Sequence, residues 1–404
     1  MKKIRWLALM LIVVASMPTP ATARPESPAN LSRLVVIGDS LSAGFQNSSL
    51  LGSQQTHGYA SLIAAQAGVS LTLPLIGDPG IPNVLELVSA GPPPVIGQAP
   101  GTSTGRLNPG LPVMGLAVPG ATVEDALTLI PDCDFTPANA PLVKQVVNVL
   151  TDIVLGLPGC FIDTRMSQVQ WAEALSPTTV LVWLGSQDAL QAVIYGADPA
   201  LVTPTKDFKR AYRTVMQRLA ATNATIVVAN IPDVTVIPYL TPAEDVAAIV
   251  GLPLSVVGPL LGIGAGDFVT PDAFPLIPGI LAVPGSGPLP DAVVLDTDKV
   301  AVIRRAIKRF NTIIEAEAEQ VGAAVVDIHK LLDRATRQGL LVGDRRLTTD
   351  FLGGLFSLDG IHPTNTGYAI IANEFIKALN HRFHAGIPPV DVEAVLSDDP
   401  LVFP

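Results

Sequence analysis

Charged side chains are scarce in this 404-residue chain. Lys, Arg, Asp and Glu make up 15% of it and aromatic residues 5%, whereas apolar residues make up 49%. No run of like charges occurs, and the formal net charge is -10. Neither nucleic acid nor an anionic membrane surface is therefore expected as a partner held by charge, because both attract clustered Lys and Arg. The length allows two domains, and one large α/β domain with insertions fits as well.

An apolar run with a targeting pattern begins the chain, in MKKIRWLALMLIVVASMPTPATA, residues 1–23. It starts with Lys2, Lys3 and Arg5, continues with apolar residues and ends in Ala-Thr-Ala, a small-x-small cleavage pattern. We interpret it as a secretory signal peptide, which predicts a secreted or periplasmic protein. The alternative is a retained N-terminal anchor.

Cysteine is almost absent, since Cys133 and Cys160 are the two in the chain. The oxidising compartment of an exported protein favours a disulfide between them, with two free buried thiols as the alternative. Such a bridge would contribute roughly 3 to 4 kcal/mol by restricting the unfolded chain. Neither cysteine has a CxxC partner or a nearby histidine, so a redox or metal-binding role is not expected.

Apolar runs typical of buried parallel strands recur along the chain. They lie at 33–38, 178–185, 224–231 and 323–328. Stretches with helical spacing lie at 57–67, 122–130, 206–222, 299–320 and 366–381. Alternation of strands and helices predicts a doubly wound α/β domain, whose ligand site lies at the carboxyl ends of the strands. The sequence Gly-Asp-Ser, which ends in Ser40, stands at such an end.

Three segments rich in Pro, Gly and aliphatic residues interrupt this alternation. They are insertions at about 70–115, 131–165 and 232–298. Loops this long have a function or structure of their own. They either fill extra core or cover a site with an apolar wall or lid, and we favour the second because aliphatic residues are unusual in surface loops. We expect the domain to span 24–385, followed by a C-terminal tail at 386–404.

A serine hydroxyl becomes a nucleophile when a base takes its proton, and the base needs a third group to hold its tautomer. The segment LFSLDGIHPTNTGY places Asp359 three residues before His362, with Gly360 between them for a tight turn. At this offset the carboxylate can bond Nδ1–H and leave Nε2 free toward a serine such as Ser40. The alternative is a turn with incidental residues.

The other histidines are expected to be structural. They are His57, His329, His381 and His384. His381 and His384 lack a third nearby ligand, so no metal is expected. No glycine-rich phosphate loop follows a strand, so no cofactor is expected.

The segments VVIGDSLSAG and DGIHPTNTGYAIIAN resemble the first and last blocks of the GDSL family of SGNH hydrolases, which are serine esterases and lipases with a flavodoxin-like parallel sheet. The resemblance covers about 33–381, and the three insertions account for a separation of the blocks that is long for the family. It implies that Ser40 is the nucleophile, His362 the general base and Asp359 the residue that orients the base.

The resemblance also implies an oxyanion hole formed by the Ser40 amide, a glycine amide and the side chain of a Gly-x-Asn-Asp block. Gly120, in GLAVPGATVEDAL, matches the glycine block; Gly285 ends a second LAVPG, but the order of the blocks favours Gly120. In the third block, GSQD, Gln187 stands where the family has asparagine. Its amide can donate the same bond but is one methylene longer.

The sequence therefore predicts a secreted serine hydrolase that cleaves carboxylic esters through an acyl-enzyme. The apolar insertions favour a lipid-like ester, hence a lipase or long-chain carboxylesterase, and transient contact with a lipid surface. One alternative is a carbohydrate O-acetyl esterase, whose site would be polar and aromatic. Another is a catalytically weak envelope binding protein on the same scaffold, for which Gln187 is the support.

Overall fold

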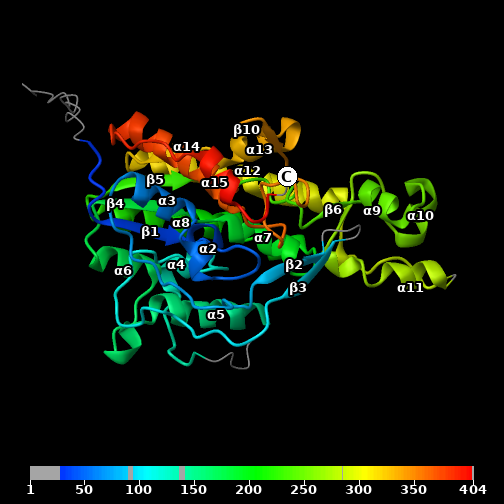
Figure 1. Cartoon of the computed structure of the whole chain (residues 1–404), viewed down its shortest axis with the longest axis horizontal. Coiled ribbons are helices and arrows are strands. Elements are labelled where there is room, and N and C mark those ends of the chain that lie inside the picture. The colour runs from blue at the N-terminus through cyan, green and yellow to red at the C-terminus, as the bar shows by residue number, and fades with distance from the viewer. Residues whose placement is uncertain (1–27, 90–93, 136–141, 284, 403–404) are drawn as a thin grey trace, which may run out of the picture.

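The computed structural model describes residues 28–89, 94–135, 142–283 and 285–402 (Figure 1). The signal peptide predicted at residues 1–23 lies outside these ranges. Within them, no single helix is long and apolar enough to cross a membrane, although one pair of helices bent by 106° has the necessary length and composition together.

A parallel sheet of four strands lies at the centre of the molecule, in the order β1-β4-β5-β9. The strands are β1 (Leu34–Gly38), β4 (Thr179–Trp183), β5 (Thr225–Ala229) and β9 (Ala324–Val326). The segment that contains Leu116 pairs with the free edge of β1, where the Leu116 amide donates to the Val36 carbonyl at 2.8 Å. When this segment is counted as the second strand, the order is that of a flavodoxin-like sheet, as predicted.

Helices cover both faces of the sheet because its strands are apolar on both sides. Val35 and Ile37 of β1 point into one core, and Leu34 and Val36 point into the other; all four are fully buried. The first core is covered by α4 (Val123–Thr128), α6 (Gln168–Ala174), α7 (Ser186–Ile194), α8 (Thr205–Ala220) and α12 (Thr297–Gln320), and the second by α3 (Tyr59–Gln66), α13 (Ile328–Gln338) and α14 (Asn365–Phe383). This arrangement confirms the doubly wound α/β fold.

The first two insertions contain regular elements and are joined to each other. They hold the hairpin of β2 (Leu85–Ser89) and β3 (Val95–Gln98), helix α5 (Leu142–Leu155) and the short turn η1 (Gly159–Phe161). The buried Arg106 guanidinium donates to the carbonyls of Val154 at 3.3 Å and Leu157 at 2.7 Å, at the end of α5. Burial lowers the pKa of Arg106 to about 10, and these carbonyls stabilise its charge. Cys133 and Cys160 form a disulfide within the second insertion, with Cα atoms 5.7 Å apart.

The third insertion forms a small unit at one end of the molecule (Figure 1). It contains a three-stranded sheet of β6 (Thr241–Pro242), β7 (Phe268–Val269) and β8 (Val294–Leu295), and helices α9 (Ala243–Val250), α10 (Leu254–Leu261) and α11 (Ile277–Ala282). Val246, Leu261 and Val269 are fully buried in its own apolar cluster. Just before β6, the Tyr239 amide donates to the Gly360 carbonyl at 2.9 Å. The unit is therefore attached beside the loop that carries His362.

Residues 386–402, in the part of the chain for which the sequence suggested a tail, pack on the domain. Helix α15 (Val392–Asp398) contacts α14, and Ile387, Val390 and Leu396 are buried in the second core. The Asn380 side chain donates to the Ile387 carbonyl at 2.8 Å and accepts from its amide at 2.9 Å. The folded domain thus extends past the expected boundary because these apolar side chains complete the cover of α14. The hairpin of β10 (Leu340–Val342) and β11 (Arg345–Leu347) lies between α13 and α14 in the chain.

Candidate active site

Ser40 lies at the carboxyl end of strand β1, as the first residue of the short helix α1 (Ser40–Ala43). Asp39 caps this helix with its side chain. The preceding Gly38 has no room for a side chain, because a Cβ there would lie 2.6 Å from the Trp183 carbonyl oxygen. A buried strand followed by this tight turn holds the Ser40 hydroxyl at the edge of the sheet.

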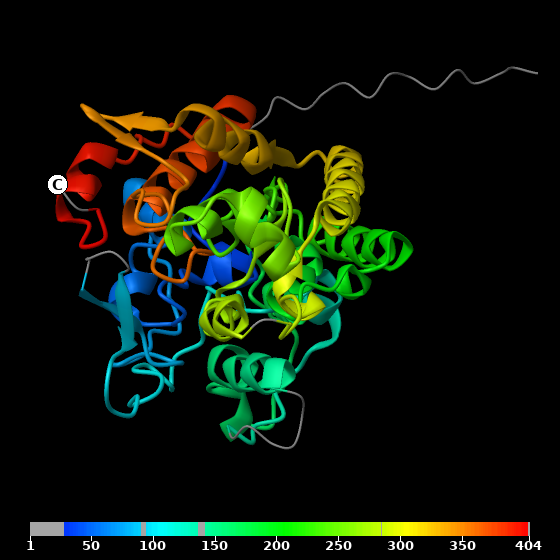
Figure 2. The same cartoon turned by 90° about the vertical axis from the view of Figure 1, so that its right-hand side faces the viewer.

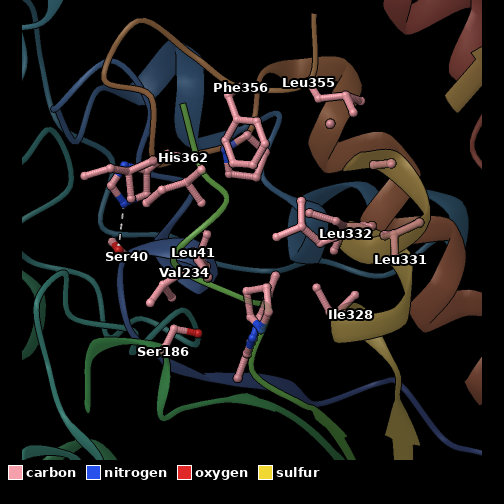
Figure 3. A pocket seen from close by; sticks show the side chains of 18 of the residues that line it. Ser40, Leu41, Ser186, Val234, Ile328, Leu331, Leu332, Leu355, Phe356 and His362 are labelled. Atoms are coloured by element: carbon pink, nitrogen blue, oxygen red, sulfur yellow. Dashed lines mark hydrogen bonds between the residues drawn. The ribbon is translucent and has the colours of Figure 1, made fainter. Parts of the chain in front are cut away.

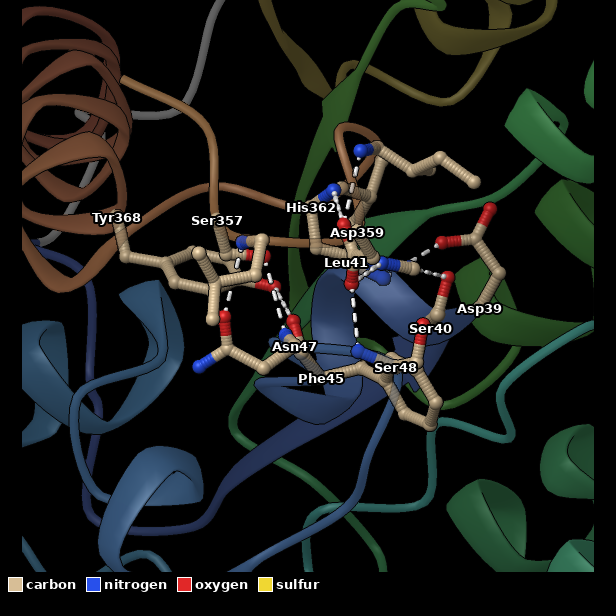
Figure 4. Close-up of polar contacts among 12 residues, drawn as sticks. Asp39, Ser40, Leu41, Phe45, Asn47, Ser48, Ser357, Asp359, His362 and Tyr368 are labelled. Atoms are coloured by element: carbon tan, nitrogen blue, oxygen red, sulfur yellow. Dashed lines mark hydrogen bonds and ion pairs between the residues drawn. The ribbon is translucent and has the colours of Figure 1, made fainter. Parts of the chain in front are cut away.

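Ser40, His362 and Asp359 form a continuous hydrogen-bonded relay (Figure 4). His362 Nε2 lies 2.8 Å from Ser40 Oγ, and Nδ1 lies 2.9 Å from Asp359 Oδ2. The carboxylate also accepts from the amides of Ile361 and His362 at 2.8 Å and of Ser48 at 2.7 Å. Because these donors orient the carboxylate, the Nδ1 proton is held by Asp359 and Nε2 is free to accept from Ser40. The three residues singled out in the sequence are thus brought together.

The Asp359 side chain is 4% exposed, and its carboxyl is nevertheless ionised. Burial alone would raise its pKa, but the charge of His362 and the hydrogen bonds from His362 and from the Ser48 amide outweigh burial, so the pKa lies below its usual value. An ionised carboxylate at Nδ1 stabilises the imidazolium that forms when His362 takes a proton.

Hydrogen bonds join the chain that follows α1 to the loop that carries His362. The Asn47 amide donates to Ser357 Oγ at 3.0 Å, and Asn47 Oδ1 accepts from the Leu358 amide at 2.9 Å. The centroids of the Phe45 and His362 rings lie 4.8 Å apart. These contacts explain how two segments distant in sequence hold one geometry (Figure 4).

The amides of Ser40 and Gly120 are available as oxyanion donors. The Val118 amide donates to the Gly38 carbonyl at 3.1 Å, which brings Gly120 to the end of β1. Gly120 has a φ of 82°, a left-handed conformation that favours glycine. Neither amide donates to any residue that the structure describes. Gly285, the competing glycine, is exposed in the third insertion.

The third block opens helix α7, and its Gln187 lies in the wall of the same cavity as Ser40. Burial raises the pKa of the Tyr195 phenol, and the nearby Gln187 side chain opposes that effect. The neighbouring Ser186 hydroxyl is buried and has no hydrogen-bond partner in the part of the chain that the structure describes (Figure 3).

Two buried carboxyl groups near the relay escaped the sequence analysis. Asp39 and Asp188 are each 1% exposed, and burial raises the pKa of each to about 7, against the opposing effect of the Leu41 and Val123 amides. Both are therefore largely protonated below neutral pH. Their position inside the Gly-Asp-Ser and Gly-Ser-Gln-Asp blocks was the available signal, but burial cannot be read from a block.

A sequence model of the family described as GDSL-like Lipase/Acylhydrolase matches residues 34–375, which include the whole relay. The chain belongs to this family. It is accordingly a carboxylic ester hydrolase, and the resemblance of its first and last blocks to the GDSL family is confirmed. No curated protein matches the chain.

Several solved structures resemble the GDSL chain at low identity. The psychrotrophic esterase EstA from Pseudoalteromonas sp. is 14% identical, with 87% of this chain and 97% of that one covered and a TM-score of 0.35. A mutant of Axe2, an acetyl-xylooligosaccharide esterase from Geobacillus, is 10% identical, with 88% and 96% covered and a TM-score of 0.36. A GDSL-like lipase from Parabacteroides merdae is 13% identical, with 89% and 100% covered and a TM-score of 0.35. Likenesses at this level do not bear on the substrate.

The relay of this GDSL hydrolase opens onto an apolar cavity (Figure 3). The cavity has an empty volume of about 820 Å³, part of it open to solvent. Its walls include Val234, Ile328, Leu331, Leu332, Leu355 and Phe356. Apart from the reacting pair, the polar side chains at its surface are Asp39, Ser186, Gln187 and the Trp183 indole.

The remaining histidines of this GDSL hydrolase make contacts elsewhere. His57 Nδ1 lies 2.7 Å from the Ser53 carbonyl oxygen, and His329 Nδ1 lies 3.1 Å from that of Ile231. His381 and His384 lie at the end of α14. No group of three or more His, Cys, Asp or Glu residues that could hold a metal ion occurs among the described residues.

Proposed function

We propose that this GDSL acylhydrolase is an exported serine esterase that cleaves long-chain acyl esters through an acyl-enzyme. One observation carries the proposal: the Ser40 hydroxyl, hydrogen-bonded to His362, lines a cavity whose walls are almost entirely apolar. The pattern of residues 1–23 supports export.

In the proposed reaction, Ser40 Oγ attacks the ester carbonyl carbon while His362 Nε2 takes the hydroxyl proton. The amides of Ser40 and Gly120 donate to the oxygen that becomes negative. When the intermediate collapses, the bond to the alcohol breaks and His362 returns the proton to the departing oxygen. Water, whose proton His362 takes, then attacks the carbonyl carbon of the acyl group on Ser40. The acid is released and the serine hydroxyl is restored. The side-chain amide of Gln187, which lies in the cavity wall, would add a third donor.

The length of the acyl chain should control the rate, because each methylene buried in the cavity contributes about 0.8 kcal/mol. We expect kcat/KM for p-nitrophenyl esters to rise from acetate by roughly tenfold for every two added carbons until the cavity is full. The assay uses the chain after residue 23 and monomeric substrate. The same protein treated with a serine-directed sulfonyl fluoride is the control. A maximum at acetate, followed by a steady fall, would instead favour the carbohydrate O-acetyl esterase.

The third insertion carries an apolar outer surface suited to lipid. Val256 and Leu260 lie four residues apart on one side of α10 and are 50% and 51% exposed, and Ile249 of α9 is 62% exposed. Residues 219–298 contain no Lys, Arg or His, whereas they contain several Asp and Glu. Because an acidic surface is repelled by anionic lipid, we propose that this surface meets a neutral or zwitterionic lipid surface. Figure 2 views the molecule from this end, with the yellow-green helices of the unit toward the viewer.

Substitution V256D together with L260D is expected to reduce flotation of the protein with phosphatidylcholine vesicles by tenfold or more. Burying two carboxylates in the lipid interface costs more than their aliphatic predecessors contributed. Val302 on α12 is 38% exposed, so V302D is the matched control and should float like the parent. Equal flotation of parent and double variant would contradict the proposed surface, as would tighter binding to vesicles rich in phosphatidylglycerol.

A further inference from the structure

The cavity at Ser40 adjoins a surface groove, and two aliphatic side chains line both. Part of the cavity wall comes from Ala335 of α13, Leu340 of β10 and Ile370 of α14. The groove runs over β10, α14 and α15, and is larger and more polar than the cavity. Leu340 and Ile370 contribute to the surfaces of both. They therefore form the wall between the cavity and the groove.

The two wall residues are held by different elements. Leu340 is the first residue of β10, is 9% exposed and pairs with Leu347 across the hairpin. Ile370 lies on α14, the helix that begins just after His362, and is half-buried. Neither side chain carries a polar atom, so the inner surface of the wall continues the apolar lining. An acyl chain that reaches it meets packed hydrocarbon and can extend no farther unless the wall moves.

We propose that Leu340 and Ile370 set the longest acyl chain that this hydrolase accepts. The inference rests on the proposed function, since it assumes that the acyl group of the ester occupies the cavity. Shorter chains end before the wall and do not contact it. Longer chains must fold back or displace Leu340 or Ile370, so the gain in kcat/KM per carbon stops there. The wall thus limits the length of the acyl chain, and the open groove lies directly beyond it.

The test removes the wall and measures the chain-length profile. L340A and I370A should connect the cavity to the groove, so that kcat/KM for esters two to four carbons longer than the parent's optimum rises about tenfold, while that for butyrate changes less than threefold. I370W should do the opposite and lower kcat/KM for the longest chains by tenfold or more. Leu341 lines the groove but not the cavity, and it is 67% exposed. L341A is therefore the matched control and should keep the chain-length profile of the parent.

A milder pair, L340V and I370V, covers the case in which the alanine variants do not fold, because each removes a single methylene; a threefold shift in the same direction is expected. Thermal unfolding of each variant checks that the fold is retained. Folded variants whose optimal acyl-chain length equals that of the parent would overturn the proposed role of Leu340 and Ile370, but not the proposed long-chain esterase activity. A parent that prefers acetate would overturn both, so the two failures are distinct.

Discussion

Replacing Ser40 with alanine is expected to lower kcat/KM by about 10⁴-fold or more for every ester that the parent cleaves. The variant keeps the cavity, the amide donors and the His362–Asp359 pair, but it has no atom that can form the acyl-enzyme. Any remaining rate would come from oxyanion stabilisation and binding alone. The measurement compares S40A with the parent on the ester that the parent cleaves fastest.

Mass spectrometry adds a direct readout of the covalent step. A serine-directed sulfonyl fluoride should add one group to the parent, on the peptide that contains Ser40, and none to S40A. Ser53 lies on the short helix α2 (Gly52–Gln55) and is exposed, so S53A is the matched serine control and should keep both activity and labelling. Activity of S40A within tenfold of the parent would show that another residue is the nucleophile.

Substitution D359N should reduce kcat by about 10⁴-fold with little change in KM. Both carboxylate oxygens accept only: Oδ2 accepts from His362 Nδ1 and the Ser48 amide, and Oδ1 accepts from the Ile361 and His362 amides. Asparagine would point an NH₂ group at one of these pairs of donors. If that group faces His362, the imidazole must take the other tautomer, which leaves Nε2 unable to accept the Ser40 proton.

The pattern of rescue separates orientation from simple damage to the fold. D359E keeps an ionised carboxylate and should recover part of the activity, whereas D359N should not. Asp296 caps α12 by accepting from the Lys299 amide at 2.8 Å, so D296N is a matched control that exchanges one good capping residue for another. A loss of less than tenfold in folded D359N would contradict the assigned role of Asp359.

The relay residues could be found from the sequence because they lie in two short motifs that resemble the first and last blocks of the GDSL family. Gly38 and Gly360 allow tight turns, and Asp359 reaches His362 across three residues. The Gln187 position shows the limit of such reasoning. Its place in the third block suggested an oxyanion donor, and the structure places the residue in the wall of the cavity that Ser40 also lines. The block itself does not determine where the glutamine side chain, one methylene longer than that of asparagine, points.

The insertions show what patterns of composition leave open. Their Pro, Gly and aliphatic content fitted either extra core or an apolar wall over a site. The structure contains helix α5 in the second insertion and a small sheet with three helices and its own apolar cluster in the third, and Val234 of the third insertion lines the cavity at Ser40. Composition reports that apolar side chains need burial, but it does not report whether they bury against the domain or against one another.

The strands, the five helical stretches and the parallel sheet follow from periodicity and turn chemistry, which act over a few neighbouring residues. The three relay residues follow from the resemblance of the first and last blocks to the GDSL family. The apolar cavity, the wall of Leu340 and Ile370, the packing of α15 and the raised pKa values of Asp39 and Asp188 were decided by the tertiary structure. Each of these depends on how much water and protein surround a group. That quantity is a sum over side chains from distant parts of the chain, and it exists only once they are packed.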